Sequence, residues 1–195
     1  MSDRSNGWEA VAAQLIELRS PTIGVSTLHR WIASLPVPGA VLDLGCGAGI
    51  PVSEALVNAG FDVYGIDAAP SLVAAFRQRF PTAHAACETV EDSPFFDRSF
   101  DAAVAIGLLF LLPERLQRDV VRRVADVLKP GGRFLFTAPV EGGTWPDSLT
   151  GRPSVSLGID GYKAAIDDAG LTLVGEYLDE GENHYYDARK DEDFA

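Results

Sequence analysis

The chain has few of the residues that build covalent or metal-based scaffolds. Its 195 residues include only two cysteines, Cys46 and Cys87, and three histidines. Two cysteines exclude a disulfide framework and a zinc site with four thiolates. The histidines are too scattered to predict a metal centre; they are His29, His84 and His184. We therefore expect a fold that is held by its hydrophobic core and binds no metal.

Positive charge and long apolar runs are also scarce. The chain has 16 Lys and Arg residues against 28 Asp and Glu residues, which gives a formal net charge of -12. This balance argues against binding to nucleic acids or to anionic membranes, because both need a basic surface. The longest apolar candidate, 102–112, is too short to span a bilayer, and the first residues lack a secretion signal. We therefore expect a cytoplasmic protein.

The length and the apolar content predict one domain. Hydrophobic residues make up 47% of the chain, which is enough for a core in a single unit over residues 1–195. Within this unit we expect a helical extension at 1–38 and an acidic carboxyl-terminal segment at 179–195. The sequence does not indicate an oligomeric state.

From residue 40, short apolar runs alternate with helical patterns. We predict strands at 40–44, 61–66, 83–87, 100–106, 133–138, 171–177 and 184–188. We predict two helices in the first 35 residues, with Asn6 as an N-cap, and later helices at 50–59, 71–80, 116–128 and 160–169. Residues 139–158, rich in Gly, Pro, Ser and Thr, are expected to form a long loop. The alternation indicates a parallel sheet covered by helices.

The most informative segment is the glycine-rich stretch that follows the first predicted strand. Gly45, Gly47 and Gly49 lie between this strand and a helix. Glycines at such a turn let a ligand approach the main chain, and the following helix directs its free N–H groups toward that ligand. Ile50 stands where a dinucleotide-binding fingerprint needs its third glycine. The spacing therefore disfavours a dinucleotide.

Two acids narrow the choice of ligand. Asp43 directly precedes the loop, where a carboxylate favours an ammonium group over a pyrophosphate. Asp67 ends the second predicted strand, where an acid can accept hydrogen bonds from both hydroxyls of a ribose. The pattern thus favours an adenosine that carries an amino-acid tail.

Four blocks carry a resemblance to a known family: 41–49, 63–70, 94–101 and 128–133. In this order and at this spacing they resemble the class I S-adenosylmethionine (SAM)-dependent methyltransferases, over roughly residues 36–140. The resemblance implies a doubly wound, mostly parallel seven-stranded sheet with helices on both faces. It also implies SAM as the cofactor and methyl transfer as the activity.

The resemblance implies cofactor contacts at the ends of the first four strands. The glycine loop would bind the methionine part, Asp43 its ammonium, and Asp67 the ribose. Glu88 would meet the adenine amino group, with Glu91 left open because the following stretch is one residue longer than usual. Phe95 and Phe96 are candidates for walls of the adenine. The full set of cofactor candidates is Asp43, Gly45, Cys46, Gly47, Gly49, Asp67, Ala68, Glu88, Thr89, Ala105 and Ile106.

The acceptor side is less defined by the sequence. Many relatives carry a polar residue after the fourth strand, whereas this chain reads Leu-Leu-Phe-Leu-Leu from Leu108 to Leu112. We expect an apolar wall there. The substrate candidates are Phe110, Trp145, His184 and Tyr185. Catalytic candidates are His184, Tyr185 and Tyr186, and strand alternation would place the two tyrosines on opposite faces.

The resulting hypothesis is SAM-dependent methyl transfer to a small-molecule acceptor by in-line displacement. Such a reaction needs no catalytic dyad, because the donor is already activated. An alternative hypothesis is a non-catalytic module that binds SAM or a related adenosyl compound and acts as a partner or regulator. A nicotinamide-binding oxidoreductase is disfavoured by the misplaced third glycine and by the lack of a Tyr-x-x-x-Lys pair.

Overall fold

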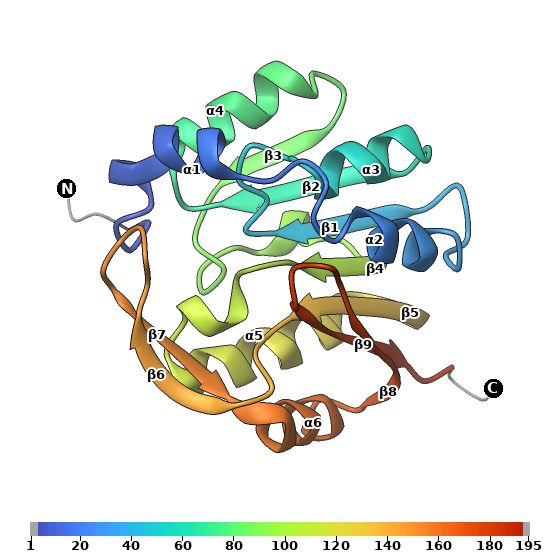
Figure 1. The fold of residues 1–195 in the computed structure, drawn as a ribbon. Helices are drawn as coiled ribbons and strands as arrows, with labels where there is room; N and C mark the ends of the chain where they lie inside the picture. The colour runs from blue at the N-terminus through green and yellow to red at the C-terminus, as the bar shows by residue number, and fades with distance from the viewer. Residues whose placement is uncertain (1–3, 193–195) are drawn as a thin grey trace.

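Seven strands form one sheet in the computed structural model, which describes residues 4–192 (Figure 1). The strand order is β3-β2-β1-β4-β5-β9-β8, and β9 runs antiparallel to both of its neighbours. The strands are β1 (Ala40–Leu44), β2 (Asp62–Asp67), β3 (His84–Cys87), β4 (Phe100–Ala105), β5 (Leu128–Thr137), β8 (Leu171–Leu178) and β9 (His184–Lys190). Segment 179–192 thus supplies an inner strand of the sheet.

Helices cover both faces of this sheet (Figure 1). One face carries α2 (Val25–Ile32), α3 (Val52–Asn58) and α4 (Pro70–Arg79), and the other carries α5 (Glu114–Val127) and α6 (Gly158–Asp168). The fold expected from the sequence, a doubly wound and mostly parallel α/β sheet, is confirmed. Successive residues of β1 alternate between the two cores: Leu42 packs in the α5–α6 core and Val41 in the other.

The chain order creates a natural crevice at the centre of the sheet. From β1 the chain moves outward to β2 and β3, and then returns to place β4 on the other side of β1. The loops after β1 and β4 therefore diverge at the carboxyl ends of the strands. Ligands of open α/β sheets bind at such a reversal point.

A hairpin replaces the long loop that the sequence predicted. Within 139–158, β6 (Gly142–Pro146) and β7 (Pro153–Leu157) pair as a separate antiparallel sheet. Asp147 closes the turn by accepting the N–H groups of Leu149 and Thr150 at 3.0 and 2.7 Å. Glycines and prolines in the two strands hide them from a search for alternating apolar residues.

The beginning of the described chain lies across the carboxyl ends of β1, β2 and β3 and is fixed at several points. Its helical elements are η1 (Glu9–Val11) and α1 (Ala12–Leu18). The Glu9 carboxylate accepts the N–H and the hydroxyl of Ser71 at 2.9 and 2.5 Å, so it caps the start of α4. The hydroxyl of Ser5, rather than the predicted Asn6, accepts the Glu9 N–H at 2.9 Å. Gly7 lies beside Thr150 and Arg152 at the hairpin turn.

Within residues 4–192, no helix is both long and apolar enough to cross a membrane.

Candidate active site

The loop after β1 keeps its main chain open toward the crevice. The N–H groups of Gly45 and Cys46 both donate to the Ile66 carbonyl, at 2.9 and 3.0 Å, which ties the loop to the end of β2. Gly47 has a φ of +54°, and a Cβ built there would meet nothing within 4 Å. Gly49, at φ +85°, is required for packing instead, because a Cβ there would overlap the Phe80 ring.

Asp67 is held at the end of β2 with both carboxylate oxygens directed by the backbone. One oxygen accepts the Gly47 N–H at 2.9 Å and the other accepts the Ala69 N–H at 2.8 Å. A carboxylate has about four acceptor positions, so each oxygen retains capacity for a ligand hydroxyl. Burial raises the pKa of Asp67, and the hydrogen bonds from Ala69 and Gly47 oppose that rise.

Asp43 lies beneath the loop and is almost fully buried, with 2% of its surface exposed. Its Oδ2 accepts the Ser53 hydroxyl at 2.5 Å. Burial raises the pKa of Asp43 to about 7, and the Ser53 hydrogen bond and the charge of Arg19 moderate the rise. A buried acid of this kind favours a bound cation, which would restore its ionised form.

A cavity of about 500 Å³ lies at this edge of the sheet. Nine of the eleven cofactor candidates line it: Asp43, Gly45, Cys46, Gly47, Asp67, Ala68, Glu88, Thr89 and Ile106. Gly49 and Ala105 do not; Ala105 is fully buried in the sheet core. Glu88 and Glu91 both line the cavity, so the choice between them stays open. Cys46 packs its sulfur against Gly65. Phe95 and Phe96 pack in and against the α5–α6 core, away from the cavity lining.

Sequence reasoning missed Arg19, which lines the same cavity. Its guanidinium lies 3.8 Å from the place of a Cβ on Gly107, just after β4. It acts on Asp43 through its charge, and it makes no hydrogen bond or ion pair with any other side chain among residues 4–192. The signal in the sequence was an arginine in the break between the two predicted amino-terminal helices, directly before Ser20 and Pro21.

The outer part of the cavity has apolar walls from two segments. Leu15 and Ile16 come from α1, and Leu108, Leu111 and Leu112 come from the turn around η3 (Leu109–Leu111). Leu108 also packs over Gly45, where a Cβ would approach it to 3.1 Å. The apolar wall expected after the fourth strand is therefore present at the cavity.

The residues that the sequence suggested for the acceptor do not line this cavity. Phe110 and Trp145 pair with each other, with ring centres 6.0 Å apart. The His184 ring nitrogen lies 3.1 Å from the Glu176 carboxylate.

The tyrosines next to it are also engaged elsewhere. The Tyr185 hydroxyl donates to Asp179 at 2.8 Å and borders a small space beside Arg19. Tyr186 is fully buried on the other face, stacked on Phe136, so the two tyrosines do face opposite sides.

Comparison with known proteins shows what the chain is similar to. The sequence model of a methyltransferase domain matches residues 41–132. Methyltransferase GfsG of Streptomyces halstedii is 32% identical over 154 residues, covering 69% of this chain and 53% of the relative. A ubiquinone biosynthesis O-methyltransferase of Xanthomonas campestris is 30% identical over 169 residues, covering 84% of this chain and 62% of the relative.

These similarities support a class I SAM-dependent methyltransferase. The chain spans between about half and two thirds of the length of these curated relatives. Among solved structures, the CcbJ methyltransferase of Streptomyces caelestis superposes with a TM-score of 0.78 at 17% identity, covering 98% of this chain and 100% of that one. Magnesium protoporphyrin IX methyltransferase from Synechocystis, solved with bound SAM, gives a TM-score of 0.69 at 16% identity, covering 92% of this chain and 80% of that one.

The cavity fits SAM chemically. The open main chain at Gly47 leaves room for a ligand, and Asp67 offers acceptors suited to a pair of hydroxyls. The methionine tail of SAM carries an ammonium and a carboxylate, which pair with an anion and a cation that lie close together. Asp43 and Arg19 supply such a pair. No group of three or more potential metal ligands occurs in the described part of the chain.

Proposed function

We propose that the protein transfers a methyl group from SAM to a small-molecule acceptor. The observation that carries the proposal is one continuous cavity with a polar half and an apolar half. The polar half is formed by Asp43, Gly47 and Asp67, and the apolar half by α1 and the η3 turn.

Each residue of the polar half has a proposed role. Asp67 accepts the ribose hydroxyls, and its bonds to Gly47 and Ala69 fix its orientation before the cofactor arrives. Asp43 meets the ammonium of the methionine tail, and Arg19 meets its carboxylate. Glu88, or Glu91 in its place, accepts the adenine amino group.

When bound, SAM supplies an activated methyl group, so the chain mainly has to orient the two reactants and exclude water. Alignment of reacting groups can contribute about 7–11 kcal/mol to the lowering of a barrier. In this chain, Leu108 and Leu111 exclude water beside Gly107, where β4 ends. A side chain has to accept a proton in this step only when the acceptor itself must lose one.

We infer a small-molecule acceptor from three observations. Relatives include, by their names, ubiquinone biosynthesis and aklanonic acid methyltransferases. The cavity of about 500 Å³ is of the size that binds small ligands, and the net charge of -12 disfavours nucleic acids. In this proposal residues 1–38 form the acceptor-side part of a single domain, because Leu15 and Ile16 of α1 line the apolar half.

Calorimetric titration with SAM, S-adenosylhomocysteine and NAD tests the cofactor assignment. We expect saturable binding of the two adenosyl compounds and none of NAD; binding of NAD alone would refute the proposal. Methyl incorporation from labelled SAM into a panel of small acceptors tests catalysis. Silence across a broad panel, with normal SAM binding, would favour the alternative of a non-catalytic adenosyl-binding module.

A further inference from the structure

The first described segment, residues 4–19, forms part of the wall of the cavity. Eight of its residues line the cavity: Arg4, Ser5, Asn6, Trp8, Leu15, Ile16, Glu17 and Arg19. Most of the remaining wall comes from the ends of β1, β2, β3 and β4 and from the segments that follow them. A ligand in the cavity therefore meets this segment, although none of the cofactor candidates drawn from the sequence lies in it.

The segment follows the cavity from one end to the other. Its beginning lies just after β3, where the Arg4 guanidinium donates to the Thr89 hydroxyl at 3.5 Å and pairs with Asp92. Its end lies close to β1, where the charge of Arg19 acts on Asp43. These two places are the ones proposed above for the adenine and for the methionine tail of SAM. The segment would therefore run along the whole length of the bound cofactor.

Trp8 is placed where the segment passes the adenosine position. Its indole packs against a small apolar cluster whose buried members are Ala12, Ala69 and Leu72. The N–H of Ala69 donates to Asp67, the acid proposed for the ribose, at 2.8 Å. Trp8 is half-buried and lines the cavity together with Leu72. The indole therefore presents an aromatic surface to a ligand beside the ribose acid.

The segment is attached to the rest of the protein through a small contact area. The cluster around Ala12 is separate from the two cores that pack on the faces of the sheet. The ion pair of Arg4 with Asp92 and the bonds from Ser71 to Glu9 are exposed to solvent. Exposed ion pairs and small apolar contacts contribute little free energy, so regions held by them open while the rest of a fold stays intact. A ligand that contacts the segment favours its closed position.

We propose that residues 4–19 act as a clamp that closes over SAM, with Trp8 as a cofactor-binding residue that packs on the adenosine. This rests on the proposed function, of which it needs only the binding of SAM in this cavity. Aromatic side chains stack on the face of a nucleobase and leave its polar edge free, so Trp8 does not compete with Glu88 for the adenine amino group. Because Trp8 and Arg19 belong to the same segment, closure brings both to the ligand together.

The first experiment measures binding of S-adenosylhomocysteine by calorimetry in variants of Trp8. We expect Trp8→Leu, which keeps an apolar contact with the cluster but has no aromatic face, to weaken binding about tenfold. Trp8→Phe keeps an aromatic face and should stay within about threefold of the unaltered chain. Trp145→Leu is the matched control, because Trp145 packs against Phe110 and does not line the cavity. Full affinity in Trp8→Leu would show that Trp8 only fills the cluster and would overturn the contact with the ligand.

Tryptophan fluorescence reports the same contact. The chain has three tryptophans, and Trp31 is buried and donates to Asp187. We expect S-adenosylhomocysteine to change the emission of the unaltered chain and of Trp145→Phe. In Trp8→Phe, which still binds, most of this change should be lost. An undiminished change in Trp8→Phe would mean that the ligand acts on another tryptophan, and it would refute the placement of Trp8.

Closure is tested at a residue that does not touch the ligand. Glu9 does not line the cavity, but its carboxylate holds the segment on Ser71. We expect Glu9→Ala to raise the dissociation rate of labelled S-adenosylhomocysteine, chased with unlabelled ligand, by about three- to tenfold, which is the effect of a lost helix cap. Glu114→Ala, in the first turn of α5, is the matched control and should leave the rate unchanged. An unchanged rate in Glu9→Ala would make the segment a fixed wall and would overturn the clamp.

Hydrogen exchange separates this proposal from the one on which it rests. Binding of S-adenosylhomocysteine should slow amide exchange in α1, whereas exchange in α5 should stay the same. If the unaltered chain does not bind SAM or S-adenosylhomocysteine, the proposed function itself fails. If it binds them while exchange in α1 does not change, the cofactor assignment stands and the clamp is overturned.

Discussion

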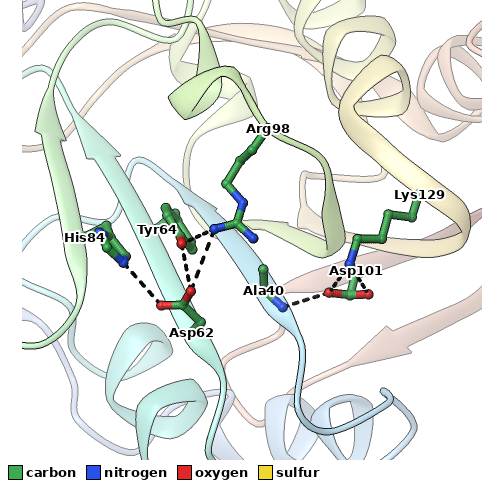
Figure 2. Close-up of polar contacts among 7 residues, drawn as sticks. All are labelled: Ala40, Asp62, Tyr64, His84, Arg98, Asp101 and Lys129. Atoms are coloured by element: carbon green, nitrogen blue, oxygen red, sulfur yellow. Dashed lines mark hydrogen bonds and ion pairs between the residues drawn. The ribbon is translucent and has the colours of Figure 1, made fainter.

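Charged side chains lie both where the parallel strands begin, here called the amino edge of the sheet, and where they end, the carboxyl edge. The two groups differ in how their charges are paired. At the amino edge, Asp62, Tyr64, His84 and Arg98 contact one another (Figure 2). The Tyr64 hydroxyl donates to Asp62 at 2.7 Å. The His84 ring stacks on the Tyr64 ring with the ring centres 4.2 Å apart, and the Arg98 guanidinium carbon lies over the same ring, 4.2 Å from its centre. Every charge there has a protein partner and is partly exposed.

The second cluster at the amino edge follows the same rule (Figure 2). Asp101 accepts the Ala40 N–H at 2.8 Å and the Lys129 ammonium at 2.8 and 2.9 Å. At the carboxyl edge, by contrast, Asp43 is buried with a single hydroxyl partner and Arg19 has none among the described side chains. Charged groups that a fold leaves buried or without an ion-pair partner are typical of ligand sites. Ion pairs at the surface contribute little to stability.

The largest expected effect comes from removing Asp67. We expect Asp67→Ala to weaken SAM binding by about 10²–10⁴-fold, because two charge-assisted hydrogen bonds are lost at about 1.5–3 kcal/mol each. Calorimetry measures the affinity, and circular dichroism checks that the fold is retained. Asp62→Ala, at the opposite edge, serves as the control and should leave SAM affinity unchanged. Equal losses in both variants would show that the edges do not differ in function.

A smaller loss is expected from neutralising Arg19. Arg19→Gln removes the proposed partner of the SAM carboxylate and should weaken SAM binding by about 10–100-fold. It should have little effect on the free energy of unfolding, because the guanidinium makes no hydrogen bond or ion pair with a side chain among residues 4–192. Arg98→Gln is the control. Retention of full SAM affinity by Arg19→Gln would remove Arg19 from the cofactor site.

The titration of Asp43 should make SAM binding depend on pH. The ionised carboxylate attracts the ammonium, and its pKa of about 7 means that it becomes protonated as pH falls below 7. SAM affinity should therefore fall by about tenfold between pH 8 and pH 6, as calorimetry at several pH values would show. In Asp43→Asn this part of the pH dependence should disappear and the affinity should be low throughout.

Asp43 should make the stability of the protein without cofactor depend on pH in the opposite direction: stability falls as pH rises, whereas SAM affinity rises. Because the folded-state pKa of Asp43 is raised, the folded protein without cofactor binds an extra proton between about pH 4 and pH 7. Its contribution to stability is present at low pH and is lost as pH rises through 7. Thermal unfolding at pH 8 should therefore give Asp43→Asn a midpoint equal to or above that of the unaltered chain; a clearly lower midpoint would contradict the burial argument.

The smallest effect is expected at the amino edge. Partial burial raises the pKa of Asp101, but the Lys129 ion pair and the Ala40 N–H outweigh it and lower the pKa overall. Lys129 is half-exposed, so Lys129→Met should cost less than about 1 kcal/mol of stability in denaturant unfolding and leave SAM affinity unchanged. The cost should fade as pH drops below the range where Asp101 is ionised.

The polar lining of the cavity was predictable because its residues lie at or next to strand ends. Asp43, Gly45 and Asp67 each follow or end a strand, and parallel strands bring such positions to one edge. The apolar half was harder to predict because it depends on where α1 docks. Arg19 and Ile16 reach the cavity only once Glu9 has fixed the beginning of the chain to α4.

The acceptor candidates near the end of the chain show the same limit. His184 and Trp145 drew attention as polar and aromatic groups, but their partners come from pairings that no local pattern reveals. The β8–β9 pairing places His184 next to Glu176, and the β6–β7 hairpin places Trp145 against Phe110. Pairing between strands decides which side chains find a partner, and sequence periodicity does not predict that pairing.

The antiparallel direction of β9 has a practical consequence for anyone who handles the protein. Strand β9 starts at the ligand edge and ends at Lys190, whose ammonium donates to the Ala125 and Leu128 carbonyls at the far edge. The beginning of the described chain, around Gly7, instead lies at the ligand edge beside the hairpin turn. A probe attached near Lys190 therefore lies away from the mouth of the cavity, whereas one attached near Gly7 lies beside it.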